Sequence, residues 1–222
     1  MGTTIELEAA DGHKLSAYRA EPQGAPRGGV LVIQEIFGVN DHIRSVCDGY
    51  AQAGYLAIAP ALFDRVERGV ELGYDEPGIQ GGIKVVSQMK PGNTLRDLQA
   101  ATDALSEAGK VGVVGYCYGG TMAWVSAAKL EGIACAAGYY GGQIDKQVAL
   151  SPRVPVILHF GERDHAIPME AVDAVRKAHP DVPVHVYPAG HGFNCDARDS
   201  YDAESAKLAR ERTLELFAKH VG

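Results

Sequence analysis

The sequence predicts a single-domain α/β fold with a mostly parallel central sheet, an antiparallel N-terminal start and helices on both faces. Two observations carry this prediction: short strand-like runs recur along the chain, and segments with helical periodicity separate them. The 222 residues are long enough for one sizeable core. No repeat, linker or low-complexity tract divides residues 1–222, so we expect one domain.

Two kinds of pattern predict the strands. Residues 3–8 and 14–19 alternate around the turn dipeptide Asp11-Gly12, which predicts a hairpin that opens the sheet. The continuous apolar run at 29–34 is typical of a strand buried on both faces. Further strands are expected at 56–59, 110–115, 133–139, 154–160 and 182–187.

Helices are expected between these strands. A helix over 42–53 follows the capping dipeptide Asn40-Asp41, and Asn93 caps a helix that runs to about residue 108. Three more helices are expected at 117–129, 169–178 and 203–220.

Residues 62–92 form a long connection without a clear period, rich in glycine and charge and interrupted by Pro77 and Pro91. Long connections in compact domains are usually functional, so we expect a cap or substrate loop there.

Composition argues against several classes of function. The net charge is −7 and the basic residues are dispersed, which makes nucleic acid an unexpected partner. No apolar run approaches the roughly 20 residues of a membrane span. The start of the chain lacks the basic and apolar regions of a signal peptide, so a cytoplasmic location is expected. No large apolar stripe is visible, and a monomer or weak homo-oligomer is expected.

The four cysteines indicate free thiols. Cys47, Cys117, Cys135 and Cys195 form no CxxC pair, and their irregular spacing does not fit a disulfide frame. His191 stands four residues before Cys195, but no second ligand pair lies nearby, so we expect no metal site. Cys47 and Cys135 are expected to be inert core thiols, and the predicted chemistry requires no cofactor.

Cys117 is the candidate nucleophile. It stands between Gly115 and Gly119, directly after a buried strand, and glycines at these positions permit a tight strand-to-helix turn. The start of the following helix favours a thiolate, and the Tyr118 amide can donate to an oxyanion. The alternative is that Cys117 is a small hydrophobe in a glycine-rich turn.

A nucleophilic thiol needs a base and an orienting acid, and on this kind of fold the chain order is nucleophile, acid, histidine. Asp164 and His191 each follow a predicted strand, so both come at the carboxyl edge of the sheet with Cys117. These three residues are the predicted triad. Glu162 is the rival acid, and His165 shares the loop of Asp164.

Two other candidates have ordinary structural alternatives. His159 falls inside a predicted strand and is expected to be a core histidine. Tyr140 either lines the substrate pocket or only packs.

The chain resembles the dienelactone hydrolase (carboxymethylenebutenolidase) family of the α/β-hydrolase fold, whose nucleophile is a cysteine. The resemblance covers essentially the whole chain. It rests on G-Y-C-Y-G-G at 115–120, G-E-R-D-H at 161–165 with Pro168, G-H-G-F at 190–193 and Q-E-I-F-G at 34–38.

This resemblance implies roles for two further residues. Glu35 contacts the thiol and accepts its proton when substrate arrives, and the Ile36 amide joins that of Tyr118 in the oxyanion hole. A carboxylate beside a neutral thiol also discourages a standing thiolate and protects it from oxidation. The alternative for Glu35 is a surface residue at a strand end.

The family binds a substrate carboxylate with two arginines, and here the chain departs from the pattern. Four residues after His191 it has Cys195, and Arg198 is the nearest candidate. Residues 71–90 contain no arginine, although two arginines lie just before them. The expected substrate contacts are Phe37, Arg65, Arg68, Tyr140, Phe193 and Arg198.

The sequence thus predicts a hydrolase that opens a lactone or cleaves a small carboxylic ester through a Cys-His-Asp triad and an acyl-enzyme. The resemblance implies conversion of dienelactone to maleylacetate. One alternative is an ester hydrolase for a non-carboxylate substrate, and another is a thiol-based sensor of a ligand or oxidant on the same fold. A flavodoxin-like amidase or glutaminase fits the separate Asp164 loop and the antiparallel first strands less well.

Overall fold

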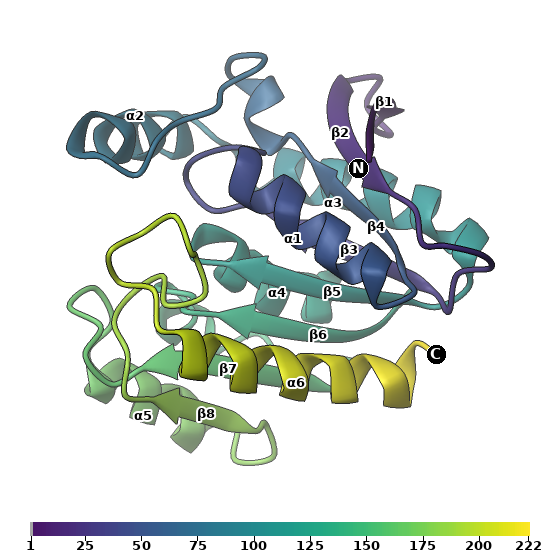
Figure 1. The fold of residues 1–222 in the computed structure, drawn as a ribbon. Helices are drawn as coiled ribbons and strands as arrows, with labels where there is room; N and C mark the ends of the chain where they lie inside the picture. Colours follow the sequence, from purple (N-terminus) through teal and green to yellow (C-terminus); the bar gives the residue numbers. More distant parts are fainter. Residues whose placement is uncertain (1) are drawn as a thin grey trace.

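A mixed eight-stranded sheet forms the centre of the structure, a computed structural model that describes residues 2–222 (Figure 1). The strand order is β1-β2-β4-β3-β5-β6-β7-β8. β1 and β2 form the antiparallel hairpin, β2 pairs antiparallel with β4, and all later neighbours pair parallel, so the predicted sheet is confirmed. The strands are β1 (Thr3–Glu8), β2 (Lys14–Ala20), β3 (Gly29–Ile33), β4 (Leu56–Pro60), β5 (Val111–Tyr116), β6 (Ile133–Tyr139), β7 (Val156–Gly161) and β8 (Val184–Tyr187).

Helices cover both faces of this sheet. α1 and α6 lie on one face, and α3, α4 and α5 lie on the other (Figure 1). Among the residues that the structure describes, no helix has the length and apolar character needed to cross a membrane. The helices are α1 (Asp41–Gln52), α2 (Glu76–Val86), α3 (Pro91–Leu105), α4 (Tyr118–Lys129), α5 (Met169–Ala178) and α6 (Ala203–His220), with short 3-10 turns η1 (Leu62–Arg65), η2 (Ser106–Ala108) and η3 (Asp145–Gln147).

The segment predicted to be irregular holds a helix that the sequence patterns did not reveal. The Asp75 side chain accepts from the Gly78 amide at 3.0 Å and so caps α2. This helix contains three glycines, each of which lowers helix propensity by about 1 kcal/mol. The sequence therefore showed no clear helical pattern here. α3 also begins earlier than predicted, because Pro91 occupies its first turn, where its missing N–H is tolerated.

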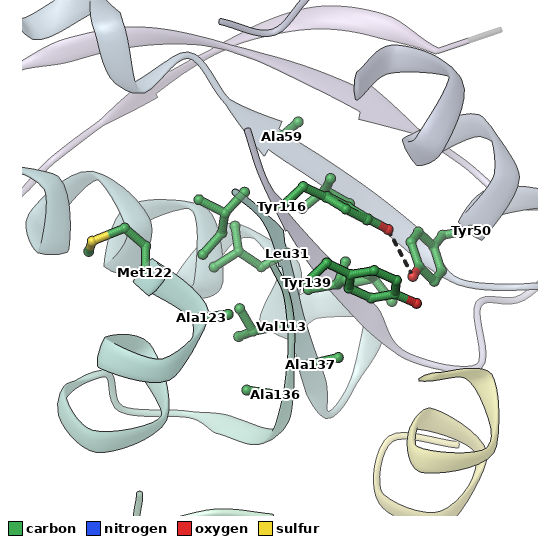
Figure 2. Packing of buried hydrophobic residues seen from close by; sticks show 14 of the residues in the cluster. Leu31, Tyr50, Ala59, Val113, Tyr116, Met122, Ala123, Ala136, Ala137 and Tyr139 are labelled. Carbon is green, nitrogen blue, oxygen red and sulfur yellow. Dashed lines mark hydrogen bonds between the residues drawn. The ribbon is translucent and has the colours of Figure 1, made fainter. Parts of the chain in front are cut away.

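The core lies between the sheet and its helices. β3, β4 and β5 are buried along their full length, as the apolar run of β3 predicted for a parallel strand covered on both sides. Tyr116 packs with Tyr50 and Tyr139 at the centre of one layer, and the Tyr50 and Tyr116 hydroxyls lie 3.4 Å apart (Figure 2). Cys47 and Cys135 are buried in this core as free thiols, and burial raises the pKa of Cys135 to about 12, as expected of inert cysteines.

Candidate active site

Cys117 occupies a tight turn between the end of β5 and the start of α4. Its backbone has φ 54 and ψ −113, a conformation that residues other than glycine rarely adopt. A Cβ at Gly115 would overlap the Gly119 carbonyl oxygen, and one at Gly119 would overlap the Ile33 carbonyl oxygen. Both glycines are therefore required by close backbone approach, as the G-x-C-x-G pattern predicts.

The structure joins Cys117, His191 and Asp164 in one chain of hydrogen bonds. His191 Nε2 lies 3.2 Å from Cys117 Sγ, and His191 Nδ1 lies 2.7 Å from Asp164 Oδ2. The other oxygen of the Asp164 carboxylate accepts from the Ala166 and Ile167 amides at 2.8 and 3.1 Å, which fixes its orientation. The rival acid Glu162 is exposed, and so is His165. The three residues singled out from the sequence are the ones that meet.

The surroundings of the His191 imidazole favour its protonated form. Burial disfavours the imidazolium, but the hydrogen bonds to Asp164 and Cys117 and the charges of these groups outweigh burial and raise the pKa of His191 to about 10. Because the pKa is raised above 6.5, the stability that this group contributes is fully present below pH 6.5 and is lost as the pH rises through about 10.

Replacing Cys117 with alanine is expected to lower the pKa of His191, because one of its hydrogen-bond partners and the associated charge are removed. The measurement is an NMR titration of the His191 ring in both proteins. In the wild type the ring should titrate well above pH 6.5, and in Cys117→Ala it should titrate at lower pH. Identical midpoints in the two proteins would show that the hydrogen bond to sulfur is absent in solution.

Glu35 is buried directly after β3 and is not the surface residue of the alternative interpretation. The Tyr74 hydroxyl donates to its Oε2 at 3.3 Å, and Arg198 Nη1 lies 3.6 Å from its Oε1. Gln34 holds the neighbouring backbone, since its side chain donates to the Glu35 carbonyl oxygen and accepts from the Leu62 amide. The carboxylate thus has one cationic neighbour and one hydroxyl donor.

Two of the three candidate arginines do not reach this site. Arg65 pairs with both Asp97 and Asp11 at 2.7 to 3.2 Å, and these bonds occupy all of its guanidinium nitrogens. Arg68 donates to the Lys14 carbonyl oxygen at the β1–β2 hairpin. The structure therefore corrects the expectation that Arg65 and Arg68 contact substrate, because both guanidinium groups are engaged in holding the fold together.

Arg198 is the arginine that the structure brings to Glu35. Its guanidinium lies 5.8 Å from the centre of the Phe37 ring and 5.6 Å from that of Tyr74, a distance typical of cation–π contacts. Its side chain is 18% exposed, so it is accessible to a small ligand while remaining partly desolvated. A carboxylate at this place would meet a positive charge in a partly buried environment.

The remaining predicted contacts are aromatic and buried. The Tyr140 ring centre lies 5.2 Å from that of His191 and 5.4 Å from that of Phe193, and none of the described residues forms a hydrogen bond with its hydroxyl. Phe37 packs edge-on against Tyr74 at 4.5 Å. His159 is a core histidine as predicted, since its ring nitrogens lie 2.8 and 3.2 Å from the hydroxyls of Tyr187 and Thr213.

Sequence reasoning missed the residues that surround Glu35 on its other sides. Tyr74 comes from the segment before α2, and His42 lies in the first turn of α1. One ligand-type atom from each of Glu35, His42 and Cys195 lies within 4.8 Å of the others. The spacing of His191 and Cys195 gave no reason to expect a metal site, and only the folded chain places Cys195 beside Glu35 and His42.

The fold and the strained turn at Cys117 define the class of the protein. A mostly parallel sheet with such a strand–turn–helix, followed in the chain by an acid and a histidine, is the plan of the α/β-hydrolases. An esterase structure from Pyrococcus furiosus is similar to the chain with a TM-score of 0.74 and 15% identity, over 100% of this chain and 93% of that one. This likeness shows the fold alone.

The family follows from closer matches. The model of the dienelactone hydrolase family matches residues 15–221. A carboxymethylenebutenolidase of Pseudomonas putida is 35% identical over 96% of this chain and 95% of its own length. A crystal structure of a protein described as a dienelactone hydrolase, from Klebsiella pneumoniae subsp. pneumoniae MGH 78578, has a TM-score of 0.85 and 32% identity over 99% of this chain and 100% of its own. The chain belongs to the dienelactone hydrolase family and is a hydrolase acting on ester bonds, which confirms the resemblance.

Proposed function

We propose that the protein opens a lactone or cleaves a small ester that carries a carboxylate, through a covalent intermediate on Cys117. The observation that carries the proposal is the hydrogen-bonded chain Cys117–His191–Asp164, which supplies a nucleophile, a base and an orienting acid. The named relative, a carboxymethylenebutenolidase, acts on a substrate of this kind, and conversion of dienelactone to maleylacetate is the specific reaction we propose.

Acylation begins with attack of Cys117 Sγ on the substrate carbonyl carbon. The thiol proton moves to the Glu35 carboxylate, and the carbonyl oxygen becomes an oxyanion that accepts from the amides of Ile36 and Tyr118. The Tyr118 amide is in the first turn of α4, where backbone N–H groups have no partner within the helix. The carbon–oxygen bond of the ester or lactone then breaks, the departing alkoxide or enolate oxygen takes the proton held by Glu35, and a thioester remains on Cys117.

Deacylation uses His191 as the base. In the thioester the sulfur no longer carries the charge that helps to hold a proton on His191, so its neutral Nε2 takes a proton from water, and the resulting hydroxide attacks the thioester carbonyl. Asp164 holds the other ring nitrogen, so that Nε2 is the one that faces the water and the leaving sulfur. Hydrolysis releases the acid product and restores the Cys117 thiol.

The helix α2 is positioned to support the oxyanion hole, because Gly82 packs against the Ile36 backbone. A Cβ at Gly82 would overlap the Ile36 carbonyl oxygen, so the helix or the Ile36 peptide must shift to accommodate it. We therefore expect Gly82→Ala to lower kcat by at least about 10-fold, since loss of one oxyanion donor costs about 10²–10³. Helix propensity alone favours alanine over glycine by about 1 kcal/mol, so a weaker helix would not explain this loss of kcat.

Gly81→Ala is the matched control for Gly82→Ala. It adds a methyl group one residue earlier in the same helix, where the nearest atom belongs to the flexible Leu72 side chain at 3.3 Å. Steady-state kinetics should show an unchanged kcat for Gly81→Ala. Equal kcat values for the two variants would contradict the role given to Ile36.

Recognition of the substrate carboxylate is assigned to Arg198, the arginine beside Glu35. A substrate carboxylate that pairs with Arg198 draws this cation away from Glu35, and Glu35 becomes free to take the thiol proton. Binding of the correct substrate and activation of the nucleophile are thereby coupled. Residues 62–92, which contribute Tyr74 to this site, act as the cap.

The experiment compares a carboxylate-bearing lactone with its neutral methyl ester, using wild type, Arg198→Gln and Arg68→Gln. A charge-assisted hydrogen bond contributes about 1.5–3 kcal/mol, so Arg198→Gln should reduce the preference in kcat/KM for the carboxylate by about 10- to 150-fold. Arg68→Gln, at the distant hairpin, should retain the preference. A preference that survives in Arg198→Gln would show that another group binds the carboxylate.

A further inference from the structure

A cluster of possible metal ligands lies beside the predicted catalytic residues. Glu35 follows β3, His42 is in the first turn of α1, and Cys195 is in the loop between β8 and α6. One carboxylate oxygen, one ring nitrogen and Sγ from these residues all lie within 4.8 Å of one another. All three residues are buried, with exposures of 0%, 8% and 0%.

Two polar atoms in this cluster have no hydrogen-bond partner among residues 2–222. They are Oε1 of Glu35 and Nε2 of His42, and both are buried. Oε1 has Arg198 Nη1 at 3.6 Å as a charged neighbour, and a buried polar atom without a hydrogen bond costs about 1–3 kcal/mol, so both atoms would gain from a ligand that bonds to them.

The surroundings of His42 are those of a metal-binding imidazole. Asp196 Oδ1 lies 3.2 Å from His42 Nδ1 and accepts from it, which leaves the lone pair on Nε2. A carboxylate on the second ring nitrogen is the usual outer partner of a ligating histidine, because it fixes the tautomer and raises the basicity of the ring. A cavity of about 430 Å³ between α1 and α6 is lined by His42 and Asp196, so this histidine and its carboxylate partner border open space.

We propose that Glu35, His42 and Cys195 form a binding site for a thiophilic divalent cation such as Zn²⁺. One carboxylate, one imidazole and one thiolate are donors that Zn²⁺ accepts together, whereas Mg²⁺ and Ca²⁺ prefer oxygen alone. Zinc–ligand bonds of about 2.0–2.3 Å require the three side chains to close in by roughly 1 Å. The Cys195 thiol releases its proton to solvent as the metal–sulfur bond forms, and water fills the fourth position.

The bound cation would compete with Arg198 for Glu35. The charged groups that face the site are Glu35, Asp196 and Arg198, and Arg198 Nη1 lies 3.6 Å from Glu35 Oε1. A divalent ion on Glu35 repels this guanidinium and prevents Glu35 from taking a proton. This consequence rests on the proposed function: Zn²⁺ would be a reversible inhibitor that a chelator removes.

Metal binding is tested by calorimetry with Zn²⁺ and by the absorption of Co²⁺, first in the Cys117→Ala protein, which lacks the nucleophilic thiol as a competing ligand. We expect one ion per chain with a Kd in the micromolar range or below, and a cobalt–thiolate charge-transfer band. In this background Cys195→Ser should remove the band and weaken binding at least about 10-fold. His42→Gln should weaken binding by a similar factor, and Cys135→Ala, which removes another buried thiol, should leave it unchanged.

Several results would overturn the proposal. One is the absence of binding at about 100 μM Zn²⁺. Another is an affinity for Zn²⁺ that is the same in Cys195→Ser and His42→Gln as in the parent protein. Thermal unfolding with and without Zn²⁺ provides a second readout, because an ion that binds only the folded chain raises its Tm. Binding without inhibition of the wild-type enzyme would support the site and contradict the role proposed for Glu35 in catalysis.

Discussion

Replacing Cys117 with alanine is expected to lower kcat/KM by about 10⁴-fold or more on every ester or lactone that the protein hydrolyses. The thiol is the group within 3.2 Å of His191 Nε2, and without it no covalent intermediate forms. Any residual rate comes from the oxyanion hole and from substrate binding. Steady-state kinetics on a neutral aryl ester and a carboxylate lactone measure the effect.

Two companion variants separate catalysis from folding. Cys135→Ala removes a buried thiol far from the turn and should retain activity. Cys117→Gly relieves a backbone held at φ 54, and such strain costs on the order of 1–3 kcal/mol, so urea unfolding should show an equal or greater stability together with the loss of activity. Wild-type rates in Cys117→Ala would show that Cys117 is not the nucleophile.

Asp164→Asn has the second largest expected effect, a loss of about 10³- to 10⁴-fold in kcat. The Ala166 and Ile167 amides donate to Oδ1, so they hold the carbonyl oxygen of an asparagine toward themselves. Its amide nitrogen then donates to His191 Nδ1. The imidazole proton moves to Nε2, where it faces Cys117, and the ring can no longer take a proton from the water that hydrolyses the thioester.

Glu162→Gln is the control for this substitution, because it makes the same chemical change two residues earlier at an exposed side chain. It should leave kcat within about 2-fold of the wild type. An NMR spectrum of the His191 ring reports the tautomer in both variants. If Asp164→Asn keeps its activity and Glu162→Gln loses it, the orienting acid is Glu162 and not Asp164.

The sheet and the chain of three catalytic candidates were predictable because they depend on local patterns. The apolar run before Cys117, the turn at Asp164 and the turn at His191 each mark the carboxyl end of a parallel strand, and such ends meet at one edge of a sheet. The glycines on either side of Cys117 added a steric requirement that the backbone confirms.

The surroundings of Glu35 were not predictable, because they depend on contacts between distant segments. Arg65 and Arg68 stand close to the cap in sequence, but buried Asp97 and the β1–β2 hairpin hold them elsewhere. His42 and Cys195 are 153 positions apart, and only the packing of α1 against the loop before α6 brings them to Glu35. No periodicity or residue spacing in a single sequence predicts a contact between side chains so far apart in the chain.

Mass spectrometry of the enzyme quenched during turnover of an activated aryl ester shows whether Cys117 carries the acyl group. The expected result is a single added acyl mass in the wild type, mapped to the peptide that contains Cys117 and absent from Cys117→Ala. Turnover without any adduct, or an adduct on Cys195 in place of Cys117, would show that Cys117 is not the nucleophile.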